Sequence, residues 1–580
     1  MNHDCQAVLP ADSTRGRSVR GGPAVALSAL LLWVPPLQTP PQKQGIEIRG
    51  TVVSALEGKS VEGATVTLMK RVPTGQGMVE QTVTDERGTF TLRAPSAGEY
   101  SLSASRFPLA FGEYGRNPFT ASPQRWFRVT GPTSGIVVEL WALPIITGAV
   151  RDENDQPVAR ASIRIMQWSV LGGREVLRQR TRTPTDARGV YSLQQVPPGT
   201  YVLAAVPPAM VAGPAQPIQY YLNATTPTAA TPVELGASRV TRGIDFVIRR
   251  ERGFTISGAV EIPPGLPGPY ILELYETPAD GLLSNLEAAR AVSKDGRFTF
   301  PPVAPGSYEI RFVRYAERLP NSVPDGAVRT TGDRRGPERL ASIPDGPTWW
   351  AAERADVVDK DIDVSIRLRQ GVRLRGRVVF EGSGPPPEPP VLPTRGVYLR
   401  SLDHRFFGSV QLGSPREDGS FRTVAVPPGR YALGMLDAYD GFHLESITVG
   451  GRDVAGVGFD LDRDLDDAVL TFSSRATVVS GRVAGEPGER FVLMWPQDET
   501  LWSASGSGLG RLYRAVTVDG SYRLAVFPGT YRLIALPGLP PPEWESPAYL
   551  RSLSLSPFAQ EVIVRAGQTV IHNPPLATRR

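Results

Sequence analysis

Short stretches in which apolar and polar residues alternate recur along the whole chain. Phe90-Thr91-Leu92 and Phe298-Thr299-Phe300 are two of them, and a period of two predicts strands with one buried face. Asp-Gly, Arg-Gly and Pro-Gly pairs lie between these stretches, where glycine supplies the positive φ and proline the fixed φ of tight turns. Amphipathic helical stretches are scarce, the nearest being 281–292. The pattern therefore predicts an all-β protein.

Three signatures recur five times, each time in the same order. A Gly-x-Val segment starts each unit, an Asp-Gly-aromatic turn follows, and a turn ending in tyrosine comes about ten residues later. The first glycines are Gly50, Gly148, Gly258, Gly376 and Gly481. The aromatic residues are Phe90, Tyr191, Phe298, Phe421 and Tyr522, and the tyrosines are Tyr100, Tyr201, Tyr308, Tyr431 and Tyr531.

The repeat predicts a tandem array of about five antiparallel β-sandwich domains, because six or seven short strands per unit suffice for two packed sheets. The expected units are 45–143, 144–252, 253–370, 371–475 and 476–580, after a leader at 1–44. Their last strands are expected at 136–140, 244–248, 362–368, 457–461 and 562–564. The acidic stretch 460–467 is expected to be a flexible joint between the fourth and fifth units.

The second unit resembles a known family. The resemblance rests on Gly148-Ala149-Val150-Arg151-Asp152, on Thr185-Asp186-Ala187-Arg188-Gly189-Val190-Tyr191 and on Val196-Pro197-Pro198-Gly199-Thr200-Tyr201. Together they are similar to the carboxypeptidase regulatory-like domain, and the first unit resembles it nearly as well. The last three units keep the three signatures but carry proline-rich or unrelated stretches at 263–269, 385–393 and 486–490. The resemblance implies a transthyretin-like sandwich, grouped with carbohydrate-binding-like folds. It also implies domains that accompany metallopeptidases, outer-membrane receptors and surface proteins without chemistry of their own.

The N-terminus has the pattern of an export signal. Arg15, Arg17 and Arg20 precede an apolar run at 23–34, which is shorter than the roughly twenty residues of a membrane span. A short uncleaved anchor is the alternative. No later segment is apolar for long enough to span a bilayer, so we expect an exported chain in the periplasm, at the cell surface or outside the cell. The single cysteine, Cys5, excludes a disulfide framework in the body of the protein.

The formal net charge of +5 is small for 580 residues, and the basic residues, almost all arginine, are spread along the chain. This distribution argues against nucleic acid as a partner and leaves a diffuse attraction to acidic polymers open.

The sequence lacks the residues of a catalytic centre. A zinc carboxypeptidase needs a His-x-x-Glu pair and a distant histidine, whereas none of His404, His443 and His572 has a glutamate three residues later. There is also no Gly-x-Ser-x-Gly nucleophile motif. We therefore expect a protein that is not an enzyme and carries no cofactor.

Two aromatic pairs and one acidic run are candidate binding residues. Trp349 and Trp350, and Tyr220 and Tyr221, lie in expected insertions and could stack on sugar rings. The alternative is that these aromatics fold back to cover the edge of a sandwich. Asp460, Asp462 and Asp464 are candidate calcium ligands, with a solvated acidic linker as the alternative.

Together these features predict an exported, non-catalytic binding or adhesion protein whose partner is a polysaccharide or an envelope component. Two alternatives remain open: a structural spacer without a ligand, and an accessory subunit of a peptidase or an outer-membrane receptor.

Overall fold

The computed structural model describes residues 45–577 with gaps. The gaps are 73–74, 107–108, 116–125, 143, 195, 209–214, 237–239, 278–282, 285–286, 316–345, 384–395, 403–408, 412–414, 417, 437–438, 440, 485–489, 505–508, 518–519 and 542. The leader at 1–44 and its expected export signal lie outside the described residues.

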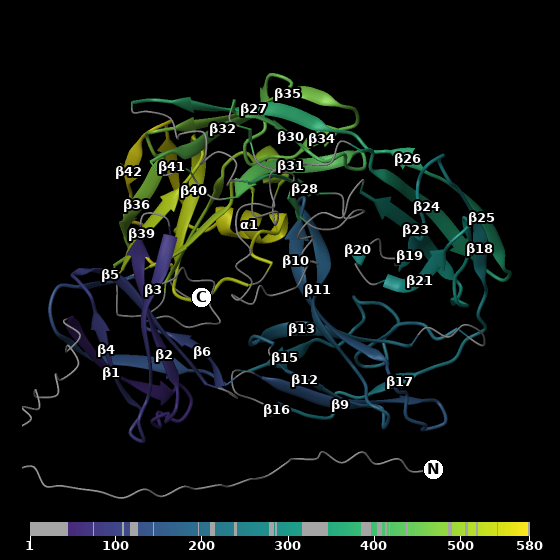
Figure 1. Cartoon of the computed structure of the whole chain (residues 1–580), viewed down its shortest axis with the longest axis horizontal. Coiled ribbons are helices and arrows are strands. Elements are labelled where there is room, and N and C mark those ends of the chain that lie inside the picture. The colour runs from purple at the N-terminus through teal and green to yellow at the C-terminus, as the bar shows by residue number, and fades with distance from the viewer. Residues whose placement is uncertain are drawn as a thin grey trace, which may run out of the picture. The chain divides into compact units, whose positions relative to one another are not determined.

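The described chain is almost entirely β-structure and forms five successive pairs of sheets, which we call sandwiches 1 to 5 (Figure 1). Sandwich 1 contains β1 (Ile46–Ser54), β2 (Thr65–Val72), β3 (Gly75–Val83), β4 (Thr89–Ala94), β5 (Gly98–Arg106), β6 (Leu109–Glu113), β7 (Phe127–Val129) and β8 (Thr133–Leu140). Sandwich 2 contains β9 (Ile145–Asp152), β10 (Ser162–Leu171), β11 (Arg174–Pro184), β12 (Val190–Leu193), β13 (Gly199–Val206), β14 (Gln219–Tyr220), β15 (Val233–Leu235), β16 (Val240–Thr241) and β17 (Phe246–Ile248).

The remaining strands complete three further sandwiches of the same kind. Sandwich 3 contains β18 (Ile256–Glu261), β19 (Tyr270–Glu276), β21 (Glu287–Ser293), β22 (Arg297–Thr299), β23 (Gly306–Arg314), β24 (Trp349–Val357), β25 (Ile362–Arg367) and β26 (Arg369–Gln370). The short strand β20 (Leu283–Ser284) pairs with β11 and extends a sheet of sandwich 2. Sandwich 4 contains β27 (Leu374–Glu381), β28 (Gly396–Ser401), β29 (Ser409–Gln411), β30 (Ser420–Arg422), β31 (Gly429–Leu436), β32 (His443–Val449), β33 (Arg452–Asp453), β34 (Phe459–Leu461) and β35 (Leu465–Ser473). Sandwich 5 contains β36 (Val478–Arg482), β37 (Phe491–Pro496), β38 (Tyr513–Val516), β39 (Ser521–Ala525), β40 (Gly529–Leu536), β41 (Gln560–Val564) and β42 (Thr569–Ile571), with the helix α1 (Pro547–Ser554).

One sheet has the same plan in every sandwich. The first strand lies between the strand that follows the Asp-Gly turn and the last strand of the unit, as in the order β4-β1-β8. The first strand pairs antiparallel with the former and parallel with the latter. The prediction of β-sandwiches is confirmed, and the structure adds this parallel pair, which local turn signals do not reveal.

The parallel pair explains the first glycine of each repeat. A Cβ atom on Gly148 would overlap the carbonyl oxygen of Ile244, closer than any nonbonded contact allows. The corresponding carbonyls crowd the other four glycines in the same way: Ile136 at Gly50, Val364 at Gly258, Ala468 at Gly376 and His572 at Gly481. In sandwich 2 the same carbonyl accepts a 2.6 Å hydrogen bond from the Tyr191 hydroxyl. Glycine is therefore required for the last strand to close the sheet.

The repeated tyrosine anchors the turn that precedes it. Its ring lies in the core, and its hydroxyl donates to the backbone carbonyl four residues earlier. These bonds are 2.6 to 2.9 Å long and join Tyr100 to Ser96, Tyr201 to Pro197, Tyr308 to Ala304, Tyr431 to Pro427 and Tyr531 to Phe527. The sequence predicted a buried ring with its hydroxyl at the rim, whereas the hydroxyl in fact fastens the turn to the strand.

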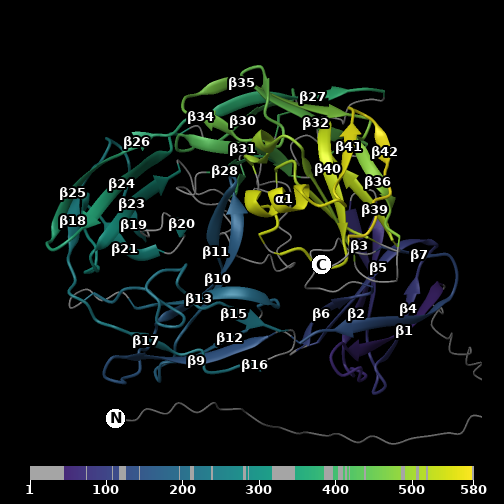
Figure 2. The same ribbon diagram turned by 180° about the vertical axis from the view of Figure 1, so that it is seen from behind.

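Each sandwich has its own apolar core between its two sheets, as alternation along the strands predicts. Sandwich 5 has a second cluster on the outer face of β37, where Leu493 and Trp495 pack against Leu550 of α1. Both views place α1 beside β40 (Figures 1 and 2). Ser546 caps this helix by accepting from the Tyr549 amide, and Pro547 occupies its first turn.

The last strands of sandwiches 4 and 5 differ from the prediction. Residues 457–461 and 562–564 alternate as expected, but they belong to β34 and β41, which pair with the tyrosine strands β31 and β40. The strands that close the sheets are β35 and β42. The acidic stretch 460–467 is therefore not a joint between units: it runs from β34 into β35, inside sandwich 4.

Candidate functional site

The outer face of the sheet β30-β27-β35 in sandwich 4 carries a group of cations. Arg375 and Arg377 are exposed on β27, while Gly376 between them faces the core, because successive residues of a strand point to opposite faces. Arg375 is opposite Arg422 of β30 in the register, and Arg377 is opposite Ser420. Two arginines on facing positions repel each other, which is unfavourable unless an anion separates them.

A fourth arginine comes from the turn before β30. Arg416 is exposed, and its backbone forms the turn: its amide donates to the Ser420 carbonyl, and its carbonyl accepts from Gly419. These are the bonds that Asp186 makes with Val190 and Gly189 in sandwich 2. Sandwich 4 therefore places an arginine where sandwich 2 has an aspartate.

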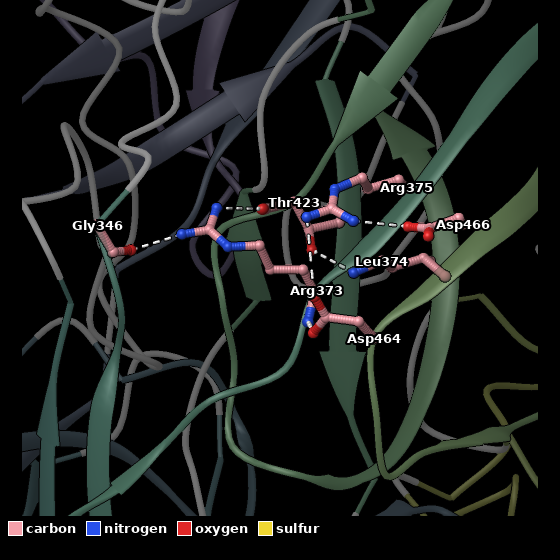
Figure 3. Close-up of polar contacts among 7 residues, drawn as sticks. All are labelled: Gly346, Arg373, Leu374, Arg375, Thr423, Asp464 and Asp466. Carbon is pink, nitrogen blue, oxygen red and sulfur yellow. Dashed lines mark hydrogen bonds and ion pairs between the residues drawn. The ribbon is translucent and has the colours of Figure 1, made fainter.

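The four arginines and two aspartates line one open groove, which we call the arginine groove. Its lining consists of Arg375, Gly376, Arg377, Arg416, Ser420, Phe421, Arg422, Asp466, Asp467, Ala468 and Val469. Arg375 forms an ion pair of 2.7 Å with Asp466, and Asp464 lies 3.7 Å away (Figure 3). These groups are half exposed, so the pairs hold little free energy, about 0–1 kcal/mol each. The groove is lined by four guanidinium groups and two carboxylates, and two further carboxylates lie beside it: Asp464 next to Arg375 and Asp418 near Arg416.

Sandwich 2 provides an internal comparison. Matching Gly148 and Tyr191 to Gly376 and Phe421 places four residues at the positions of Arg375, Arg377, Arg416 and Arg422. These residues are Thr147, Ala149, Asp186 and Ser192. The shared fold therefore does not require the cations. Sandwich 1 has one of them, at Arg49, and sandwich 5 has two, at Arg482 and Arg523, whereas sandwich 4 has all four.

A half-buried arginine holds the start of β27 in place. The guanidinium of Arg373 donates to the carbonyls of Thr423 at 3.3 Å and Gly346 at 2.5 Å, and the Arg373 amide donates to Asp464 at 2.8 Å (Figure 3). Burial lowers the pKa of Arg373. In Figure 3 the Arg373 guanidinium reaches Gly346 and Thr423, whereas the Arg375 guanidinium reaches Asp466, so Arg373 positions the strand.

The structure does not support the predicted tyrosine platform. Tyr220 is only 2% exposed and belongs to an apolar cluster on the outer face of the β10–β13 sheet. Tyr221 packs on the core with an edge-to-face contact to Phe246, at 6.0 Å between ring centres. The insertion folds back over its own sandwich, which was the alternative considered. Tyr220 is therefore a core residue and has no ring face free for a sugar.

The two tryptophans lie in a strand and not in a loop. Trp349 and Trp350 begin β24, so they point to opposite faces of the sheet and cannot form one platform. Trp349 packs on the core of sandwich 3. Trp350 is half-buried, donates to the Gln370 carbonyl and has the guanidinium of Arg369 5.2 Å from its ring centre.

The three predicted calcium ligands do not converge. Asp460 pairs with Arg430 at 3.8 Å, Asp462 with Arg463 at 3.2 Å, and Asp464 accepts from the Arg373 amide. Among residues 45–577, outside the gaps given above, no group of three acidic, histidine or cysteine side chains is placed to hold a metal. Arginines and backbone amides take the positions that a cation would need.

The histidines lie in parts of the fold with a structural role. His443 begins β32, and His404 lies outside the described residues. The ring of His572 contacts Gln560 Oε1 at 2.8 Å, and burial lowers the pKa of His572.

Glu276, at the end of β19, is surrounded by apolar and proline side chains. Burial raises its pKa to about 6, and the charge of Glu251 adds to the shift.

Glu276 gives a prediction for pH dependence. The folded chain holds this proton more tightly than the unfolded chain, so its contribution to stability falls as the pH rises from 4.5 to about 6 and then levels off. We expect Glu276→Gln to remove this slope and to stabilise sandwich 3 at neutral pH. Hydrogen exchange of β19 peptides on either side of pH 6 measures it. Glu261→Gln, at an exposed site on β18, is the control and should change nothing.

The comparisons with known proteins identify part of the chain. The model of the carboxypeptidase regulatory-like domain matches residues 47–111 and 145–231, which lie in sandwiches 1 and 2. Sandwiches 1 and 2 are carboxypeptidase regulatory-like domains. The resemblance seen in the Gly-Ala-Val and Asp-Ala-Arg-Gly-Val-Tyr segments is confirmed, as is the presence of tandem copies. A search of curated proteins finds no match to the chain.

Solved structures share only a distant likeness. The minor pilin GBS52 of Streptococcus agalactiae is 14% identical with a TM-score of 0.22, covering 39% of this chain and 100% of that one. The shaft pilin SpaA of Lactobacillus rhamnosus GG is 12% identical with a TM-score of 0.20, covering 36% and 98%. The Bacillus anthracis TIE protein is 13% identical with a TM-score of 0.14, covering 71% and 69%. At these scores the likenesses carry no argument about fold or function.

Sequence reasoning missed the arginine groove, although its parts are visible. Arg375-Gly376-Arg377 brackets a repeat glycine, and Arg422 follows the repeat aromatic. Each arginine looks like an ordinary surface residue until the strand register places it beside the others.

The part of the chain that the structure describes holds no helix long and apolar enough to cross a membrane.

Proposed function

We propose that this chain is an exported, non-catalytic binding protein in which sandwich 4 holds an anionic ligand. The observation that carries the proposal is the arginine groove, where four guanidinium groups from three neighbouring segments face two carboxylates. Guanidinium groups are suited to carboxylates, sulfates and phosphates because their planar fork donates two parallel hydrogen bonds. The two family domains and the absence of a zinc-peptidase motif from the sequence support a role without catalysis.

The basic segment and the apolar run before residue 35 support export of the chain. Serial sandwiches then suit a protein that presents a binding face outside the cytoplasm, as a binding or adhesion protein does. A polysaccharide or another envelope component is the expected partner.

Removing the cations from the groove should abolish binding to an anionic probe. We expect the full chain to bind dextran sulfate and not neutral dextran, as measured by calorimetry. The triple variant Arg377→Ser, Arg416→Ser, Arg422→Ser should weaken binding by about tenfold or more, because each lost charge-assisted bond contributes on the order of 1 kcal/mol or more. Arg377 and Arg416 are exposed and Arg422 is half-buried on the outer face of the sheet, so the fold should survive, which circular dichroism checks.

A matched control separates the groove from the overall charge. Arg49→Ser, Arg297→Ser, Arg482→Ser removes the same charge from exposed sites on the corresponding sheets of sandwiches 1, 3 and 5. We expect less than about a twofold effect, since screened charges far from the ligand contribute little. Equal losses in the two triple variants would show a diffuse attraction without a site. No binding to either dextran would instead favour the ligand-free spacer, and co-purification with a peptidase or receptor would favour the accessory subunit.

A further inference from the structure

The arginine groove combines cations with hydrogen-bond acceptors for hydroxyl groups. Asp467 is exposed at the start of β35, and Ser420 Oγ lies on the outward face of β30. Arg375 already engages Asp466, but Asp467 makes no ion pair within the described part of the chain. A carboxylate is an acceptor only, so its natural partner in a ligand is a hydroxyl or another donor. A ligand that fills this groove therefore needs both negative charges and hydroxyl donors.

The spacing of the arginines suits an anion that repeats along a polymer. Arg375 and Arg377 lie two residues apart on one face of β27, which separates their Cα atoms by about 6.6 Å. Arg377 and Arg422, which the proposal uses, are diagonal neighbours on β27 and β30, about 7–8 Å apart. Both separations are comparable with the length of one pyranose unit. A single small anion would reach only part of this row, whereas a chain of acidic sugars places one carboxylate per ring along it.

The groove lacks the features that a nucleic acid needs. Single-stranded nucleic acids bind through stacking on exposed aromatic rings, and the one aromatic side chain lining the groove, Phe421, is 4% exposed and faces the core. The two aspartates would repel a closely spaced phosphate backbone. The same aspartates favour a sugar, whose hydroxyls can donate to them.

From this combination we propose that the arginine groove binds a polyuronate, a polysaccharide whose every ring carries a carboxylate. Arg377, Arg416 and Arg422 hold the carboxylates, and Asp467 and Ser420 accept from ring hydroxyls. The inference rests on the proposed function and adds to it the chemical class of the ligand.

The test compares polymers that differ in one property at a time. The full chain is titrated by calorimetry, at physiological ionic strength, with polygalacturonate, fully methyl-esterified polygalacturonate and inorganic polyphosphate. We expect polygalacturonate to bind, and methyl esterification, which keeps the sugar and removes its charge, to weaken binding by about tenfold or more. The triple variant Arg377→Ser, Arg416→Ser, Arg422→Ser should lose the polygalacturonate interaction to a similar extent.

Asp467→Ala distinguishes a sugar site from a general anion site. In a sugar site it weakens polygalacturonate binding several-fold, because a hydroxyl acceptor is lost, while polyphosphate binding rises with the removal of a negative charge. If polygalacturonate and polyphosphate binding both rise in this variant, or if polyphosphate binds the unaltered chain more tightly, the polyuronate assignment is overturned and the anion-binding function stands. If none of the polymers, dextran sulfate included, binds, both proposals fall.

Discussion

Gly148→Val should unfold sandwich 2 in an otherwise folded chain, whereas Ala149→Val should leave it intact. The Cβ of the new side chain would occupy the space of the Ile244 carbonyl oxygen, which is backbone and cannot rotate away. It would also lie 3.0 Å from the ring of Tyr191, whose hydroxyl bonds to that carbonyl. Separating β17 from β9 is the only relief, and we expect a loss of at least about 3 kcal/mol of stability.

Hydrogen exchange of peptides from β9 and β12 measures this loss within the full chain, because it reports on each sandwich separately. Ala149→Val is the matched control: it adds the same kind of β-branched side chain one residue along the strand, on the other face. Protection of β9 that survived Gly148→Val would refute the steric role assigned to the repeat glycine. An equal loss in the two variants would show instead that any valine in this strand is disruptive.

Trp495→Ala should release α1 and the outer cluster of sandwich 5. The Trp495 ring is fully buried on the outer face of β37, and its Nε1 donates to Ser554 Oγ at 3.0 Å. Removing it empties a large part of the cluster that holds the helix and leaves the hydroxyl without this donor. We expect a loss of about 3–5 kcal/mol, typical of a buried tryptophan replaced by alanine.

Exchange of the α1 peptides should rise most, because an eight-residue helix is unstable without tertiary packing. Trp350→Ala, at the half-buried tryptophan of β24, is the control and should cost much less. Unchanged exchange in α1 after Trp495→Ala would mean that the helix is held by other contacts, such as the ion pair between Arg551 and Glu499 at 2.8 Å.

Much of the fold could be predicted because its turns are specified by residues close together in the sequence. The Asp85 and Gly88 turn before Phe90 and the Asp418-Gly419 pair before Phe421 each specify a tight reversal locally. The glycine takes a positive φ, and the aspartate accepts a hydrogen bond from an amide that follows it in the chain. Five repetitions of that local signal suffice to count the units. The helix α1 also had a local signal, Ser546-Pro547, but it is too short for periodicity to reveal.

The candidate site could not be predicted, because its residues come together only across strands. Arg375 and Arg422 are 47 positions apart, and nothing in either segment indicates that they are directly opposite. The same limit produced the wrong last strand in sandwich 4: 457–461 and 465–473 alternate equally well, and only pairing with β27 shows which one closes the sheet. Tyr220 and Trp349 were misplaced for a related reason, since an apolar ring in an insertion can cover its own domain as readily as it can meet a ligand.

The sequence by itself determined the number of units, their β-structure, the buried tyrosine of each turn and the family of the first two sandwiches. These properties follow from turn geometry and from alternation over a few neighbouring residues. The tertiary structure alone decided that the first and last strands run parallel, why the repeat glycine cannot carry a side chain, and where four arginines meet. Each of these depends on strand register between distant segments, which is set by the packing of the whole sandwich.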